Sequence, residues 1–188
     1  FRQAIALREN FYEAHNNLGN ALRAAGRSAE AIAAYTEALR LKPDYIDANN
    51  NLGAELAEAG RFAEAVTHFE TALRGKPGDA STRDNLVRAL HRHSVSLLES
   101  GRWREATVAL CRAVELAPSS ARFHAALAVA LARADRLDEA VPEFEAALRL
   151  EPNSAETHDN FGQVLNALGR KREAFEHLET AARLRRPR

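Results

Sequence analysis

Apolar and small residues recur along the chain with helical spacing, and the helices that they predict come in pairs. The first pair is expected at 12–25 and 28–41. Its marked positions are Asn17, Leu18, Gly19, Glu30, Ala31, Tyr35, Ala38 and Pro43, and one period later the same places hold Asn51, Leu52, Gly53, Glu64, Ala65, Phe69, Ala72 and Pro77. Small residues at fixed places indicate two closely packed helices, and their return at a fixed period indicates one helix pair copied several times.

The period divides the whole chain, 1–188, into a single all-α array. Residues 1–10 match the end of a preceding repeat, because Phe1 and Ala4 stand where Tyr35 and Ala38 would stand one repeat earlier. Five repeats follow, at 11–44, 45–78, 79–119, 120–153 and 154–188. Since the chain has no methionine and begins inside an element, we expect the array to belong to a longer protein.

Glycine and proline mark the ends of the predicted helices. Gly26 and Gly60 stand between the two helices of their repeats, where a tight turn needs a left-handed backbone. Pro43 and Pro77 end the second helices, because proline cannot continue their hydrogen bonding. In the fourth repeat Asp135 takes the turn position, where aspartate adopts the left-handed conformation less readily than glycine.

The third repeat is longer than the others. Pro77 and Pro118 are seven residues further apart than the other repeat-ending prolines, and residues 79–100 contain no glycine or proline. Seven residues are about two helical turns, so the same face still points toward the neighbouring helices. Helical spacing of leucines through the insertion favours one long helix from about Ala80 to Ser100. The alternative is a loop at 78–85 followed by a helix of normal length.

Leu-Gly, a glycine turn, alanine, an aromatic residue, alanine and proline follow one another in the first two repeats, and this order resembles the tetratricopeptide repeat family. Repeat four departs from it with Ala128 in place of glycine, and repeat five with Phe161-Gly162 in place of Leu-Gly. The resemblance implies antiparallel helix pairs stacked into a right-handed α-solenoid. It also implies that the first helices line a concave groove, which holds peptides or partner helices.

First-helix residues outside the apolar motif are predicted to face this groove. They are Asn16, Asn17, Asn20, Asn50, Asn51, Asn85, Arg88, Arg92, Arg122, Asn160 and Gln163. Asn17, Asn51 and Asn85 lie one period apart, and Asn160 takes the matching place in the last repeat. An asparagine amide has both donors and an acceptor, so such a ladder can pair with an extended peptide backbone. It resembles the asparagine ladder of the O-GlcNAc transferase repeats. The alternative is that these asparagines bond only within the array.

A second binding mode of the family is the carboxylate clamp, in which lysine, asparagine and arginine residues grip the acidic C-terminal tail of a chaperone. Asn20, Asn51, Arg88 and Arg92 lie near the clamp places, and the two arginines are one helical turn apart. The first clamp lysine, however, is replaced here by Asn16. The sequence therefore favours a solvated pair of arginines over a clamp.

Composition excludes several functions. Lysine plus arginine equals aspartate plus glutamate at 26 each, so no overall charge attracts nucleic acid or anionic lipid. No segment is long and apolar enough to insert into a membrane. The single cysteine, Cys111, excludes an internal disulfide and is typical of a reducing, cytoplasmic compartment.

Residues that carry chemistry are few. His91 and His93 are two residues apart and point away from each other on a helix, so they are poor metal ligands. Three histidines recur at one motif place and are predicted to pack between helices: His15, His124 and His158. Cys111 is predicted to be a buried, inert thiol. We therefore expect no catalytic site, no metal and no cofactor.

These patterns predict a noncatalytic scaffold that binds an extended peptide or a partner helix in its concave groove. One alternative is the substrate-recognition arm of a larger enzyme, such as a glycosyltransferase of the O-GlcNAc type. A second alternative is self-assembly, since the ends of a solenoid expose apolar helix faces on which other copies can stack.

Overall fold

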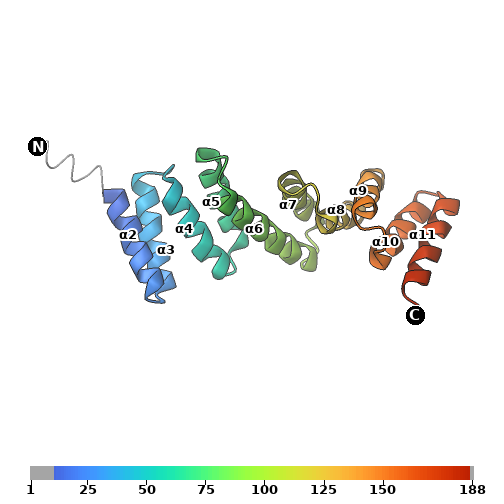
Figure 1. Cartoon of the computed structure of the whole chain (residues 1–188), viewed down its shortest axis with the longest axis horizontal. Coiled ribbons are helices and arrows are strands. Elements are labelled where there is room, and N and C mark those ends of the chain that lie inside the picture. The colour runs from blue at the N-terminus through green and yellow to red at the C-terminus, as the bar shows by residue number, and fades with distance from the viewer. Residues whose placement is uncertain (1–10, 187–188) are drawn as a thin grey trace, which may run out of the picture. The chain divides into compact units, whose positions relative to one another are not determined.

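The computed structural model describes residues 11–186, which form ten α-helices (Figure 1). These are α2 (Phe11–Ala24), α3 (Ser28–Leu41), α4 (Ile46–Glu58), α5 (Phe62–Gly75), α6 (Ala80–Glu99), α7 (Trp103–Leu116), α8 (Ala121–Arg133), α9 (Leu137–Leu150), α10 (Ala155–Ala167) and α11 (Lys171–Leu184). The all-α prediction and the pairing of helices are confirmed. The predicted end of a preceding repeat at 1–10 lies outside the described residues.

The chain divides into two compact units, Phe1–Ala89 and Leu90–Arg188, with the boundary inside α6. In the first unit α2 pairs with α3 and α4 with α5, and α3 also packs on α4. In the second unit α8 pairs with α9 and α10 with α11, while α7 packs on α8 and α9 on α10. α3 and α9 therefore each lie between the first helix of their own repeat and the first helix of the following repeat.

The elongated first helix of the third repeat is confirmed. α6 has 20 residues, whereas the first helix of the second repeat, α4, has 13. It begins after Asp79, whose Oδ2 accepts a hydrogen bond of 3.1 Å from the backbone N–H of Thr82. Leu86, Leu90 and Leu97 are all buried, so the insertion keeps one face of the helix in the core. The alternative of a loop at 78–85 is wrong.

All five turns between paired helices use the same backbone conformation. The turn residue has a positive φ, namely 73° at Gly26, 76° at Gly60, 71° at Gly101, 63° at Asp135 and 77° at Gly169. In each turn the N–H of the following arginine donates to the carbonyl of a leucine five residues earlier. This is the Schellman motif, which satisfies carbonyls left open at a helix end. Asp135 thus adopts a conformation that suits glycine better.

The turn arginine forms an ion pair at the start of each second helix. Its guanidinium binds the carboxylate of the glutamate three residues later, and the five pairs are Arg27–Glu30, Arg61–Glu64, Arg102–Glu105, Arg136–Glu139 and Arg170–Glu173. These hydrogen bonds lower the pKa of each glutamate. Because the pairs are exposed, they contribute little stability and chiefly orient side chains at the helix start.

Alanine and aromatic residues form the contact between paired helices. The alanine after the recurring glutamate of each repeat is buried: Ala31, Ala65, Ala106, Ala140 and Ala174. Tyr35, Phe69 and Phe144 are also buried, and a Cβ atom at Gly53 would lie 2.9 Å from the Phe69 ring. The small residues therefore stand where the sequence predicted close helix packing.

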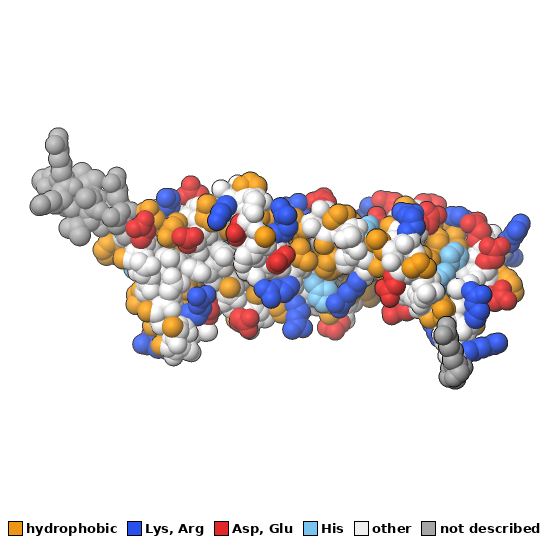
Figure 2. Space-filling model, viewed as in Figure 1, with side chains coloured by type: hydrophobic (Ala, Val, Ile, Leu, Met, Phe, Trp, Pro, Cys, Tyr) orange, Lys and Arg blue, Asp and Glu red, His pale blue; other side chains and the backbone are white. Residues whose placement is uncertain are grey.

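The surface mixes both signs of charge, as Figure 2 shows for one face, where acidic and basic side chains are interspersed. None of the helices between residues 11 and 186 is long and apolar enough to cross a lipid bilayer.

Candidate functional site

Asparagines of α2 and α4 form a hydrogen-bonded cluster in the N-terminal unit. Asn51 Nδ2 donates to Asn16 Oδ1 at 3.0 Å and to Asn20 Oδ1 at 3.2 Å. The Tyr35 hydroxyl also donates to Asn20 Oδ1, at 2.8 Å. Asn51 Oδ1 and Asn20 Nδ2 keep no partner among residues 11–186, so each amide retains one group for a ligand.

The other predicted asparagines of this unit have different surroundings. Asn16 is only 4% exposed, so it orients Asn51 and does not reach a ligand as the prediction required. Asn17 is exposed and makes no hydrogen bond within residues 11–186. Asn85 Oδ1 accepts a hydrogen bond from Arg88. The residues of the predicted ladder are thus repeated in sequence but not in their contacts.

Two buried oxygen atoms of α4 lack donors among the described residues. They are Asn50 Oδ1 and Glu55 Oε2, and Glu55 is only 5% exposed. The prediction included Asn50 and missed Glu55. The positions equivalent to Glu55 in later repeats hold Ala89, Ala130 and Val164. A carboxylate at a position that is otherwise apolar is the sequence feature that could have identified Glu55.

α8 and α10, the first helices of repeats four and five, border a groove in the C-terminal unit. Its volume is about 460 Å³, and it is lined by Leu98, Ala121, Arg122, Ala125, Ala126, Val129, Glu151, Ser154, Glu156, Thr157 and Asn160. A second cavity of about 220 Å³ shares Val129 and Asn160 with it and adds Arg133, Gln163 and Val164. The two cavities are therefore adjoining parts of one surface, which we call the α8–α10 groove.

Polar groups in the α8–α10 groove differ in how far they are engaged. The Asn160 amide makes no hydrogen bond to any residue of 11–186. Gln163 Nε2 donates to Asp159 at 3.3 Å, and Asp159 also accepts from Arg185 at 3.1 Å. Arg122 is exposed at the edge. Asn160 is thus the lining side chain with both donors and acceptor available.

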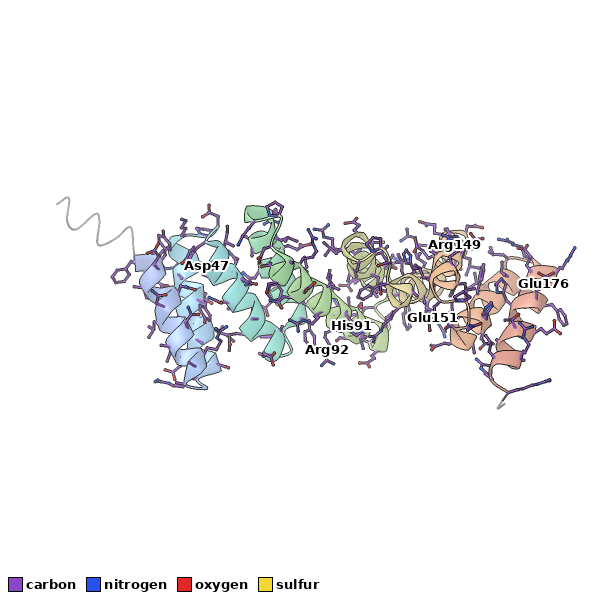
Figure 3. The ribbon with its side chains drawn as sticks, viewed as in Figure 1. Asp47, His91, Arg92, Arg149, Glu151 and Glu176 are labelled. Carbon is purple, nitrogen blue, oxygen red and sulfur yellow. The ribbon has the colours of Figure 1, made fainter. Side chains whose placement is uncertain are left out.

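The structure brings together three of the predicted site residues, Arg122, Asn160 and Gln163, in this groove. Sequence reasoning placed Ala126 and Val129 on the groove face but missed other apolar lining residues, such as Leu98 and Val164, because these followed the core pattern of their helices. Glu151, labelled in Figure 3, was missed because it lies between α9 and α10.

Arg88 and Arg92 lie on α6 and are both exposed (Figure 3 labels Arg92). Arg88 belongs to the N-terminal unit and donates to Asn85. Arg92 belongs to the C-terminal unit, next to His91. Partial burial, followed by the charges of Arg122 and Arg92, lowers the pKa of His91. The clamp has no support in the first repeat, since Asn16 is buried.

The described residues offer little other chemistry. Within 11–186 no group of three or more histidine, cysteine, aspartate or glutamate residues is placed to hold a metal ion. Cys111 is exposed on α7, so the prediction of a buried thiol is wrong. Desolvation of its sulfur by neighbouring groups, followed by the charge of Glu143, raises the pKa of the thiol. A thiol with a raised pKa is a weak nucleophile at neutral pH.

Comparison with known proteins gives consistent results. The sequence model of the tetratricopeptide repeat family matches residues 1–46, 17–80 and 91–155. No curated protein sequence matches the chain. Among solved structures, the crystal structure of YrrB, described as a TPR protein with an unusual peptide-binding site, is similar with a TM-score of 0.61 and 25% identity, covering 98% of this chain and 92% of that chain.

Structures of MamA are also similar. MamA AMB-1 has a TM-score of 0.61 and 22% identity, covering 92% of this chain and 91% of that chain. MamA from Desulfovibrio magneticus RS-1 has a TM-score of 0.54 and 21% identity, covering 93% of this chain and 95% of that chain. At these identities the likeness shows a shared fold. The family match spans more than half of the sequence and agrees with the paired helices and their turns, so the chain belongs to the tetratricopeptide repeat family.

Proposed function

We propose that this chain is a protein-interaction module and that the α8–α10 groove of its C-terminal unit binds an extended peptide. The observation that carries the proposal is the unpaired amide of Asn160 beside the apolar side chains of Ala126 and Val129. Such an amide can bond the N–H and C=O of an extended backbone. A partner helix satisfies its own backbone groups, so an extended segment suits Asn160 better than a helix.

The lining of the groove favours a small apolar side chain in the peptide. Ala125, Ala126 and Val129 leave a cavity of about 460 Å³, which is in the lower part of the range for ligand pockets. Arg122 and Glu156 both line it, so the flanking peptide positions face both signs of charge. The similarity to YrrB, whose structure is described as having a peptide-binding site, supports a peptide as the ligand.

Peptide affinity tests this proposal directly. A peptide selected from a random library on the purified chain is expected to bind Asn160→Ala about 10–100-fold more weakly, because two hydrogen bonds are lost. Val129→Glu is expected to weaken binding further, since it places a carboxylate in the apolar lining. Fluorescence anisotropy of the labelled peptide gives both dissociation constants.

Asn166→Ala is the matched control, because Asn166 is exposed on α10 and lines neither cavity. Its affinity should equal that of the natural sequence. Equal affinity of all four proteins would place binding elsewhere and refute the groove.

We propose that the asparagine cluster of the N-terminal unit also bonds the backbone of an extended peptide. Asn51 Oδ1 and Asn20 Nδ2 are an acceptor and a donor on neighbouring helices, and Asn17 is exposed beside them in sequence. The substrate-recognition arm of a larger enzyme would use the same residues, so that alternative stays a prediction about the protein to which the chain belongs.

Association of copies through the ends of the array is a second candidate function. On α2, Leu18 is 51% exposed, although its equivalent in the next repeat, Leu52, is 3% exposed against α3. On α11, Phe175 is 67% exposed and Leu178 is 37% exposed, although Phe144 holds the place of Leu178 in the preceding repeat and is buried. Within residues 11–186, both faces therefore lack the adjoining helix that covers the equivalent residues of the inner repeats.

Light scattering over a range of concentrations tests this second candidate. The mass of the natural chain is expected to rise with concentration, and Phe175→Glu is expected to keep the protein monomeric. Val108→Glu is the control, because Val108 is 73% exposed but lies on α7, away from the ends of the sequence array. A natural chain that stays monomeric at every concentration would disprove association through the ends.

A further inference from the structure

In three repeats, the side chain at one position of the first helix contacts both the preceding proline and the second helix of the same repeat. The side chain six residues after the proline hydrogen-bonds the proline carbonyl: Asn49 to Pro43 at 2.9 Å, His124 to Pro118 at 3.0 Å and His158 to Pro152 at 3.0 Å. The same side chain contacts a residue 19 positions later: Asn49 with His68 at 2.9 Å, His124 with Glu143 at 2.6 Å and His158 with His177 at 2.8 Å. The three contacts therefore share a geometry but differ in chemistry.

Hydrogen-bond roles fix the tautomers of the His158–His177 pair. A carbonyl only accepts, so His158 Nε2 must carry the hydrogen that bonds to Pro152. The neutral His158 ring then has a lone pair on Nδ1, and the 2.8 Å contact requires a hydrogen on His177 Nδ1. Two neutral rings satisfy this arrangement. The separation also suits a proton better than a tetrahedral metal ion, which would hold two nitrogens about 3.3 Å apart.

Acid changes this pair in two steps. The first added proton goes to His177 Nε2 and leaves the contact in place. A second proton has only His158 Nδ1 to occupy, where its N–H would face the N–H of His177 and two positive rings would lie with centroids 5.0 Å apart. The contact is therefore incompatible with protonation of both rings.

The surroundings of His177 act in the same direction. Burial, followed by the neighbouring His158, lowers the pKa of His177 below its ordinary value of 6.5. The carboxylates of Glu176 and Glu173 on α11 and of Glu145 on α9 oppose this shift without reversing it. Glu173 is bound by Arg170 and Glu176 by Arg172, which reduces their effect. Stability from this site is thus present above about pH 6.5 and is lost as the pH falls below it.

The equivalent contact in the preceding repeat responds differently to acid. His124 Nε2 donates to Pro118, and its Nδ1 lies 2.6 Å from a Glu143 oxygen, so a protonated ring has an acceptor at each nitrogen. In the second repeat Asn49 Nδ2 donates to the Pro43 and Tyr45 carbonyls, so Asn49 Oδ1 accepts from His68 in either charge state. The paired histidines of the last repeat differ from both.

We propose that the last repeat contains an acid-sensitive helix contact, in which His158 and His177 hold α10 and α11 together at neutral pH and separate them when both rings are protonated. The inference is independent of peptide binding in the α8–α10 groove. This contact lies within the interface between α10 and α11, on which Figure 3 labels Glu176, so acid should loosen α11 before α8 and α9.

Hydrogen exchange measured by NMR tests the proposal, with α9 as the reference in the same sample. The ratio of α11 to α9 protection factors is expected to fall about tenfold between pH 7.5 and pH 5.5. This is the effect of one proton that opened α11 binds and folded α11 does not, over about one pH unit below the ordinary histidine pKa. His177→Glu copies the His124–Glu143 contact, and its ratio should stay constant or rise. His158→Asn copies the Asn49–His68 contact, and its ratio should fall less than that of the natural chain.

Circular dichroism at pH 7.5 establishes that the variants are folded. If His177→Glu does not fold, the ring resonances of the natural chain provide the second measurement, and the pair should titrate in two separated steps. A constant protection ratio in the natural chain would overturn the proposal. So would an equal fall in all three proteins, or titration of both histidines in one step near pH 6.5.

Discussion

Replacing Phe144 with alanine should lower the free energy of unfolding of the C-terminal unit by about 3–5 kcal/mol. The Phe144 side chain is fully buried, and its ring stacks on Phe161 with centroids 5.2 Å apart and planes 19° apart. Alanine would leave a cavity between α9 and α10 that two packed helices cannot close. The cost therefore combines the lost burial with the residual cavity.

Denaturant unfolding followed by tryptophan fluorescence measures this effect, because Trp103 lies in the same unit. Helix repeats contact only their neighbours, so amides of α2 to α5 should keep their protection from hydrogen exchange. Phe175→Ala is the control, since this phenylalanine of the same unit is exposed and its loss should cost less than about 0.5 kcal/mol. An unchanged unfolding midpoint in Phe144→Ala would contradict the packing described for this unit.

Replacing Gly53 with valine should destabilise the N-terminal unit by about 1–3 kcal/mol. A Cβ atom at Gly53 would lie 2.9 Å from Phe69 Cε1, and the Phe69 ring is itself buried and unable to move into solvent. Valine therefore pushes α4 and α5 apart. Thermal unfolding followed by circular dichroism should show a lower midpoint.

Helix propensity cannot explain a loss in Gly53→Val, because valine is a better helix former than glycine. Ala54→Val is the control for placing a β-branched side chain in α4, because Ala54 is partly exposed on the same helix. Its midpoint should fall much less than that of Gly53→Val. Equal losses in the two variants would mean that the Phe69 contact is not the cause. Repeat four shows that the place admits one methyl group, since Ala128 occupies it and is buried.

Local chain chemistry allowed the fold to be predicted from the sequence. The length of α6 followed from an insertion of two helical turns without glycine or proline. The turn conformations followed from Gly26 and Gly60, and also from Asp135, which tolerates a positive φ better than most residues. These features depend on a few neighbouring residues, so a single sequence contains the necessary information.

The candidate site depended on contacts between helices and was predicted only in part. Asn51 repeats Asn17 in sequence, yet its amide bonds residues 31 and 35 positions earlier, on α2. Cys111 was expected to be buried, but it lies on an exposed face of α7. Periodicity gives the face of a helix approximately, whereas hydrogen-bond partners depend on the side chains of the neighbouring helix.

The histidines illustrate the same limit. His124 and His158 were correctly expected to lie between helices, and their common place in the repeat was visible in the sequence. Their response to acid depends on whether the partner 19 residues later is Glu143 or His177. That pairing becomes evident only when the second helix is positioned.

Chemical-shift mapping of a bound peptide tests the groove most directly. With a peptide selected on the chain, the largest NMR shift changes should fall on the Asn160 side-chain amide, the Val129 methyl groups and neighbouring amides of α8 and α10. The account would be contradicted if the chain were saturated with peptide while the Asn160 and Val129 signals stayed unchanged and the shift changes were confined to α9 and α11.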